Sequence, residues 1–187
     1  YEKGKPIAGI EIYLGPRRMA DRDPQKDRSP YHLVLLAENQ TGYQNILQIA
    51  TAAQLEGFYY RPRVDKPFLK RHAKGVIALS SCNSGELARH ILDGNPDKAR
   101  RAASWYKEVF GPEGFYVEIQ NHEGIPETAQ LNRGLVALAR ELDIGLVATN
   151  DVHYVRKEDA QAHDLLLCIG TNSSVNDEKR MKMPGAF

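Results

Sequence analysis

The alternation of short apolar segments with amphipathic helical segments constrains the fold of this chain more than any other feature. Strand-like segments cover residues 7–14, 32–37, 76–81 and 115–120 and a short run from Leu146, and helical spacing covers residues 39–53, 65–72, 84–92, 96–110, 127–142 and 157–168. Such alternation is typical of α/β proteins with a mostly parallel sheet. The sequence therefore predicts an α/β fold.

The first two strand segments follow each other without a helix between them. Residues 15–30 are polar, charged and proline-bearing, which indicates a loop. If the two strands pair antiparallel, His32 lies near the end of the first strand and toward Glu11. In the helical segment that follows, Thr41 is the expected N-cap, and the aromatic and basic residues 58–63 are expected to form a loop.

Composition narrows the class of protein. The 187 residues suffice for one domain with a core, and the hydrophobic share of 42% is ordinary for a globular protein. No apolar run is long enough to span a bilayer, and the net charge of +1 gives no general argument for nucleic-acid binding. With two widely separated cysteines, we expect a reducing, cytoplasmic location. The chain opens with Tyr1 rather than Met, so we expect a piece of a longer protein.

Asp151 and His153 directly follow the last strand segment, Leu146-Val147-Ala148. Residues i and i+2 of extended chain point the same way, so this carboxylate and imidazole can converge on one ion. The end of a strand is also where α/β sheets place their chemistry. A lone Asp-x-His is a weak signal, because a helix cap beside a surface histidine gives the same pattern.

Other ligand-type residues lie in or next to three further strand segments: Glu11, His32 and Cys82. Carboxylate, imidazole and thiolate together suit Zn²⁺, and a carboxylate-rich mixture also admits Mn²⁺ or Fe²⁺. Each residue has a simpler interpretation as well, since Glu11 could face solvent, His32 could be a hydrogen-bonded strand residue, and Cys82 could be a small core residue. His122 follows a strand and could equally be a loop residue. Spacing alone leaves a metal site and these simpler roles open.

Five stretches carry a close resemblance to a known family. They are GIEIYLGPR (9–17), HLVLLAENQTGYQNILQIATAAQLEGFYYRPRVD (32–65), GVIALSSCNSGEL (75–87), FYVEIQNHEGIPE (115–127) and LVATNDVHYVRKEDAQAHDLLLCIGT (146–171). Together they resemble the PHP (polymerase and histidinol phosphatase) domain of the alpha subunit of bacterial DNA polymerase III. The resemblance covers nearly the whole chain.

The resemblance implies a distorted, TIM-like β/α barrel with metal ligands at the C-terminal mouth of its strands. Matching the family's motifs residue by residue assigns the ligands to Glu11, His32, Cys82, Asp151 and His153, with Zn²⁺ or Mn²⁺ as the bound ion. His122, Arg61 and Arg63 become candidates for supporting those ligands or for contacting substrate. Members with an intact site are 3′–5′ exonucleases or phosphoesterases. In other members the domain is a structural module that supports the polymerase and binds a proofreading subunit.

The chain departs from the family pattern at its start, because the His-x-His and Thr-Asp-His strands of the family are absent. We therefore expect an incomplete barrel, with the PHP domain over residues 1–170 and the start of a linker toward the polymerase palm over 171–187. The Mg²⁺-binding aspartates of the polymerase are absent as well, and DNA and the other replicative subunits are expected as partners of the parent protein, without a membrane. A free-standing PHP phosphoesterase is the third reading, and it ranks last because residues 39–47 and 58–65 resemble the polymerase branch.

Overall fold

One mixed β-sheet organises the molecule, and the computed structural model describes residues 6–121 and 127–183 of the chain. The strands are β1 (Gly9–Leu14), β2 (Tyr31–Ala37), β3 (Arg63–Val64), β4 (Val76–Leu79), β5 (Phe115–Gln120) and β6 (Gly145–Thr149). The helices are α1 (Gln40–Leu55), α2 (Lys66–Arg71), α3 (Glu86–Leu92), α4 (Pro96–Phe110), α5 (Glu127–Glu141), the short 3₁₀ helix η1 (Lys157–Asp159) and α6 (Ala160–Thr171). The predicted α/β class and its alternation of elements are confirmed.

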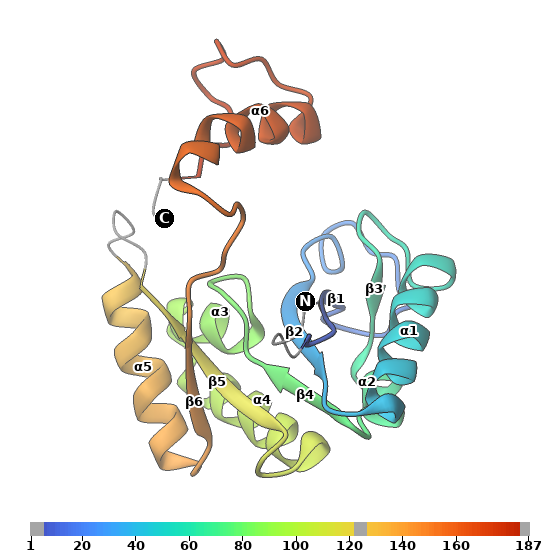
Figure 1. Cartoon of the computed structure of the whole chain (residues 1–187). Coiled ribbons are helices and arrows are strands. Elements are labelled where there is room, and N and C mark those ends of the chain that lie inside the picture. The colour runs from blue at the N-terminus through green and yellow to red at the C-terminus, as the bar shows by residue number, and fades with distance from the viewer. Residues whose placement is uncertain (1–5, 122–126, 184–187) are drawn as a thin grey trace.

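The strands lie in the order β3-β1-β2-β4-β5-β6. β2 pairs antiparallel with both β1 and β4, and the remaining pairs are parallel, so β2 runs against the five other strands of the described sheet. The expected antiparallel pairing of the first two strands is confirmed. The sheet is open, with β3 and β6 at its edges (Figure 1). This arrangement brings the C-terminal ends of β1, β4, β5 and β6 and the start of β2 to the same end of the sheet.

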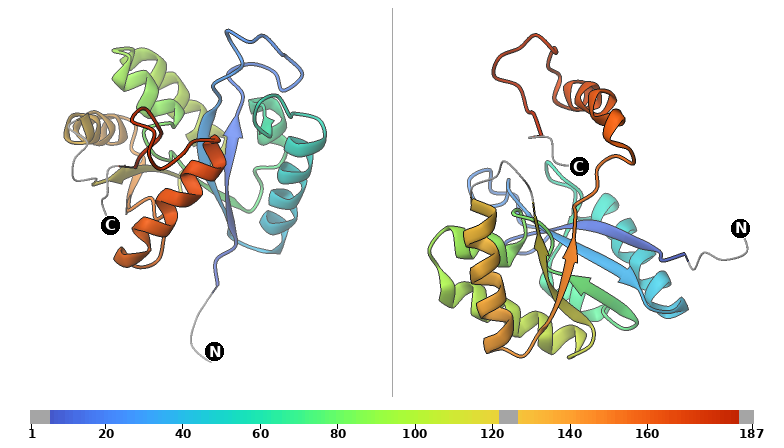
Figure 2. Two further views of the ribbon diagram at one scale, coloured as in Figure 1. Left: turned by 90° about the horizontal axis from the view of Figure 1, so that it is seen from above. Right: turned by 60° about the vertical axis from the view of Figure 1, so that its left-hand side comes forward.

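The two faces of the sheet differ in polarity. Pairing places Ile12 beside Leu33, and Leu35 beside Ala78, on one face, and all four side chains are buried. Helices α1, α3, α4 and α5 pack on this face (Figure 2). Their apolar side chains complete the core. The register puts a second set of residues on the opposite face, namely Glu11, Tyr13, His32, Tyr116, Glu118, Gln120 and Thr149. Polar chemistry is thus concentrated on the face away from the helices.

Local sequence explains the helix ends, with two corrections to the sequence-based expectations. Asn39, not Thr41, is the N-cap of α1: its side chain accepts a hydrogen bond from the Gly42 N–H at 3.1 Å. Asp65 caps α2 in the same way through Phe68 N–H. The expected loop at 58–63 ends in strand β3, which pairs parallel with the end of β1.

A buried arginine organises the long loop between β1 and β2. The Arg63 side chain is fully buried, and its guanidinium donates to the carbonyl oxygens of Gly57, Asp27, Met19 and Asp21. Asp27, also fully buried, accepts two hydrogen bonds from the Arg17 guanidinium, which lowers the pKa of the Asp27 carboxyl. These contacts fix the loop against β3.

The C-terminal segment stands apart from the sheet (Figure 1). Helix α6 follows η1 directly and ends at Asn172, which adopts a left-handed conformation with φ 52°. The Arg180 guanidinium forms a bidentate ion pair with Asp164 at 2.6 and 2.7 Å, so the residues after α6 fold back onto it. Cys168 of α6 is buried.

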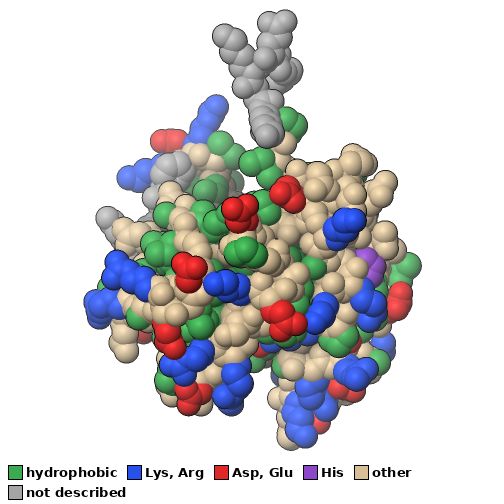
Figure 3. All heavy atoms as spheres, turned by 90° about the horizontal axis from the view of Figure 1, so that it is seen from below, with side chains coloured by type: hydrophobic (Ala, Val, Ile, Leu, Met, Phe, Trp, Pro, Cys, Tyr) green, Lys and Arg blue, Asp and Glu red, His purple; other side chains and the backbone are tan. Residues whose placement is uncertain are grey.

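The surface carries mixed charge. Seen from the end opposite α6, Lys and Arg side chains lie among Asp and Glu side chains (Figure 3). Within residues 6–121 and 127–183, no helix combines the length and the apolar character that a membrane crossing requires.

Candidate functional site

Three of the residues predicted as metal ligands lie in contact at the end of the sheet where β1 and β4 finish and β2 begins. His32, at the start of β2, has its Nδ1 atom 2.9 Å from Glu11 Oε1 on β1 and 3.8 Å from Cys82 Sγ in the loop after β4. The backbone also joins these segments, because the His32 N–H donates to the Ser84 carbonyl at 3.1 Å. The Glu11 carboxylate and the Cys82 thiol therefore both contact one nitrogen of the His32 imidazole, although Glu11 and Cys82 are 71 positions apart in the chain.

The contacts in this cluster shift the protonation equilibria of its members. The hydrogen bond with Cys82, followed by that with Glu11, raises the pKa of His32 to about 9. The hydrogen bond from His32 lowers the pKa of Glu11, opposing the effect of partial burial. At neutral pH this favours an imidazolium beside a carboxylate when no metal ion is bound.

Asp151 and His153 follow β6 and are placed by a sharp turn. Asp151 has a positive φ of 50°, and the His153 Nδ1–H donates to the Asp151 carbonyl oxygen at 2.6 Å. The two side chains approach to 4.0 Å between His153 Nδ1 and Asp151 Oδ1. His153 lies close enough to Glu11 for its charge to lower the Glu11 pKa, which is the link between this pair and the cluster at His32.

The donor types match a zinc site, because imidazole, thiolate and carboxylate are ligands that Zn²⁺ takes from proteins, and the carboxylates also suit Mn²⁺. Within residues 6–121 and 127–183, however, no three His, Cys, Asp or Glu side chains are arranged as ligands of one ion. Glu11 and Cys82 instead each contact His32. The five-residue ligand set therefore stays a prediction.

The three supporting candidates have different surroundings. Arg61 is exposed and its guanidinium lies 5.7 Å from the centre of the Tyr13 ring, whose edge in turn contacts the His32 ring at 5.0 Å between centroids. The Arg63 guanidinium donates its hydrogen bonds to backbone carbonyl oxygens, so a structural role alone accounts for this residue. His122 lies outside the described residues. The roles of all three residues toward a substrate stay predictions.

Sequence reasoning missed a buried carboxylate behind the cluster. Glu118 of β5 is 4% exposed, and its carboxylate accepts hydrogen bonds from the Ser81 backbone N–H at 3.1 Å, from Gln120 Nε2 at 3.0 Å and from Thr149 Oγ1. Ser81 precedes Cys82, and its hydroxyl lies 3.5 Å from Glu11 Oε2. The signal was present in the strand Phe115–Gln120, where two polar residues alternate with apolar ones.

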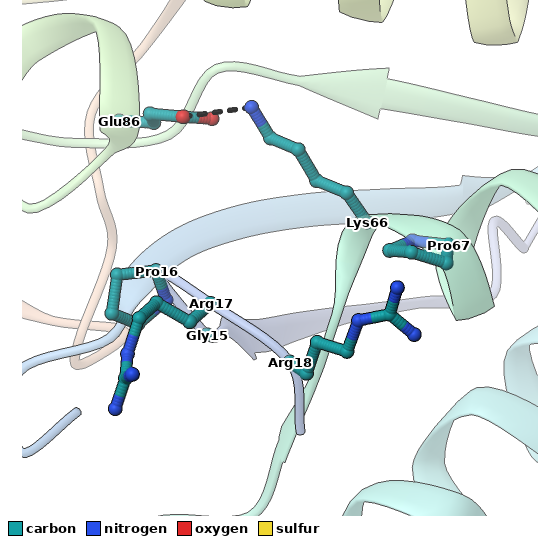
Figure 4. Close-up of a pocket in the computed structure, with 7 residues that line it drawn as sticks. All are labelled: Gly15, Pro16, Arg17, Arg18, Lys66, Pro67 and Glu86. Atoms are coloured by element: carbon teal, nitrogen blue, oxygen red, sulfur yellow. Dashed lines mark hydrogen bonds and ion pairs between the residues drawn. The ribbon is translucent and has the colours of Figure 1, made fainter. Parts of the chain in front are cut away.

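A pocket of about 260 Å³ lies near the cluster at His32, between the loop after β1 and the starts of α2 and α3. Figure 4 shows that its basic side chains do not converge: the Lys66 ammonium points to Glu86, which it contacts at 2.8 Å, and the Arg17 and Arg18 guanidinium groups point elsewhere. Because its charges are largely paired within the protein, this pocket does not present a concentrated site for an anionic ligand.

The mixed sheet with its helices is a β/α architecture of the kind that a PHP-type fold has, and comparison with known proteins identifies the family. The model of the PHP domain family matches residues 2–122 of the chain. The chain therefore belongs to the PHP domain family. Proteins of this family are generally metal-dependent, although the identity of the metal for this chain does not follow from the match.

Curated relatives narrow the class further. The chain is 44% identical over 184 residues to the DNA polymerase III subunit alpha of Deinococcus radiodurans, 43% over 180 residues to that of Borreliella burgdorferi and 44% over 182 residues to that of Thermus aquaticus. Each alignment covers 96% of this chain but only 14%, 16% and 15%, respectively, of the relative. The chain is homologous to the PHP region of these replicative polymerase subunits.

Proposed function

We propose that this chain is the PHP region of a bacterial replicative DNA polymerase alpha subunit, acting in DNA replication. The observation that carries the proposal is the alignment of 96% of the chain with subunits of that name at 43–44% identity. Nucleotidyl transfer, with its Mg²⁺ ions, then belongs to other regions of the longer protein. DNA and the other subunits of the replicative assembly are the proposed partners of that protein.

We further propose that this end of the sheet, where β1, β4 and β6 finish and β2 begins, binds a divalent metal. The ion would be Zn²⁺ or Mn²⁺, held by Glu11, His32, Cys82, Asp151 and His153. The meeting of carboxylate, imidazole and thiol at His32 Nδ1 supports this assignment. A bound ion would polarise a phosphodiester and lower the pKa of a coordinated water, the chemistry of a phosphoesterase or 3′–5′ exonuclease. The exposure of Arg61 and its position over Tyr13 support a role of its guanidinium in contacting a phosphate next to the cluster.

A non-catalytic structural module is the second candidate. It is favoured by one observation: in the described part of the chain the acidic, histidine and cysteine side chains do not form a three-ligand group. In this case the cluster at His32 would stabilise the fold by its internal hydrogen bonds and would support the polymerase and its proofreading partner mechanically.

Metal-dependent thermal stability separates these two candidates. An ion that binds only the folded chain raises its melting temperature by mass action. We expect Zn²⁺ or Mn²⁺, added after EDTA treatment, to raise the melting temperature of the chain, and Asp151→Ala with His153→Ala to abolish the gain. The control pair His72→Ala with Asp97→Ala removes the same residue types from the C-cap of α2 and from α4. This control should keep the metal-dependent gain in melting temperature. A gain that survives in the first pair unchanged would favour the structural module.

A further inference from the structure

Glu118 lies between the two parts of the candidate site, namely the cluster of Glu11, His32 and Cys82 and the pair of Asp151 and His153. Its strand, β5, lies between β4 and β6 (Figure 1), and these two strands lead into Cys82 and Asp151 respectively. On the β4 side the carboxylate accepts the Ser81 N–H, and on the β6 side it accepts the Thr149 hydroxyl. One buried side chain thus contacts both strand ends that carry predicted ligands.

The contact with Ser81 accounts for an unusual backbone conformation. Ser81 has a positive φ of 65°, a region that L-residues other than Gly, Asn and Asp rarely adopt. Its N–H points to Glu118 at 3.1 Å, and this turn directs the next residue, Cys82, toward His32. The Glu118 backbone N–H donates in turn to Ser80 Oγ at 2.8 Å, so β5 holds both residues of the turn.

The charge of this carboxylate is satisfied by hydrogen bonds alone within the described residues, where it forms no ion pair. A buried carboxylate is costly unless it is well hydrogen-bonded, and an apolar residue at this alternating strand position would pack without that cost. Its three donors come from β6, from Gln120 of its own strand and from the turn before Cys82. This selection of partners indicates a role in geometry rather than in core packing.

We propose that Glu118 is a positioning residue that sets the separation between the Cys82 side and the Asp151 side of the site. It acts through Ser81 on Cys82 and through Thr149 on the turn that carries Asp151 and His153. The inference rests on the proposed metal-binding function. Groups that orient metal ligands typically contribute about 10–100-fold to metal affinity.

Cobalt titration of the purified chain tests this role, because a Co²⁺–thiolate absorption band reports ligation by Cys82 directly. We expect Glu118→Gln to weaken Co²⁺ binding at least about tenfold and to diminish this band. Thr149→Val, which removes a single donor and disturbs the fold less, should shift affinity in the same direction by a smaller factor. Asp27→Asn is the matched control, since it changes another fully buried, hydrogen-bonded carboxylate that lies in the loop after β1.

The outcomes distinguish this inference from the proposed function. Unchanged affinity in Glu118→Gln, or equal losses in Glu118→Gln and Asp27→Asn that follow their melting temperatures, would overturn the positioning role. If the unmodified chain binds no Co²⁺, the metal site itself is refuted, and positioning is then read from the alkylation rate of Cys82 by iodoacetamide in a Cys168→Ala background. A rate changed several-fold by Glu118→Gln but not by Asp27→Asn supports the role, and equal rates refute it.

Discussion

The sheet with its helices and the C-terminal segment 150–183 both contain amphipathic helices, but they bury them to different extents. In the sheet body, Leu35, Ile49 and Leu87 are completely inaccessible to solvent. In the C-terminal segment, Leu166 is 63% and Ile169 77% exposed, and Cys168 is the buried residue of α6. An apolar helical pattern therefore predicts a helix in both regions, whereas burial depends on a partner that local pattern does not specify.

The forces that hold the two regions differ accordingly. The body is stabilised by apolar burial over one face of the sheet, which scales with the area removed from water. Within the C-terminal segment, the residues after α6 are held to this helix by the partly buried ion pair between Arg180 and Asp164. Such a pair is weak evidence for stability, because the cost of desolvating its charges offsets their attraction. The body should therefore dominate the free energy of unfolding, and α6 should open independently of it.

The largest expected effect contrasts two apolar truncations. Leu35→Ala creates a cavity in the central strand pairing and should lower the free energy of unfolding by about 2–5 kcal/mol. Ile169→Ala removes a mostly exposed side chain and should change it by less than about 0.5 kcal/mol. Urea unfolding followed by circular dichroism measures both. Equal losses would contradict the comparison, because they would require α6 to be covered in solution.

The next effect concerns the arginines of the segment before α2. Arg63→Ala leaves the buried carbonyl groups around it without a donor, and we expect a loss of about 1–3 kcal/mol in the free energy of unfolding. Arg61→Ala, two residues away and exposed, serves as the matched control and should change stability little. A large loss in Arg61→Ala would show that its contact with Tyr13 also supports the fold.

The cluster at His32 predicts a stability that depends on pH between about pH 6 and pH 10. Because the folded-state pKa of about 9 lies above the ordinary value of 6.5, protonated His32 stabilises the fold fully below about pH 6.5. This stabilisation is lost as the pH rises through about 9. In EDTA, His32→Asn should therefore lower the urea midpoint more at about pH 6 than at about pH 10, whereas His163→Asn in α6 should leave it unchanged. A His32→Asn effect that is equal at both pH values would contradict the cluster.

Much of the fold and part of the site follow from the sequence. The alternating pattern predicts the elements, and the antiparallel start predicts the approach of His32 to Glu11, because strand pairing is local there. Their positions after strands make Cys82 and Asp151 candidates, and the family resemblance assigns both to one ligand set, which spacing alone cannot do across 69 positions. Glu118 was missed because its contacts with Ser81 and Thr149 exist only through the order of the strands in the sheet. The N-cap of α1 was missed by two residues, since Asn39 and Thr41 are both residue types that suit that position.

The smallest effect tests whether α6 is energetically separate from the body. Asn39 caps α1, whose residues Ile46 and Ile49 lie in the core, so Asn39→Ala should lower the free energy of global unfolding by about 1 kcal/mol. Asp159 accepts the Arg156 N–H at 3.0 Å just before α6. Asp159→Ala should loosen that helix locally and leave global stability unchanged, while amide hydrogen exchange in residues 160–171 becomes faster. If Asp159→Ala instead lowers the global stability as much as Asn39→Ala does, α6 unfolds together with the sheet, and the difference between the two regions lies in solvent exposure rather than in cooperativity.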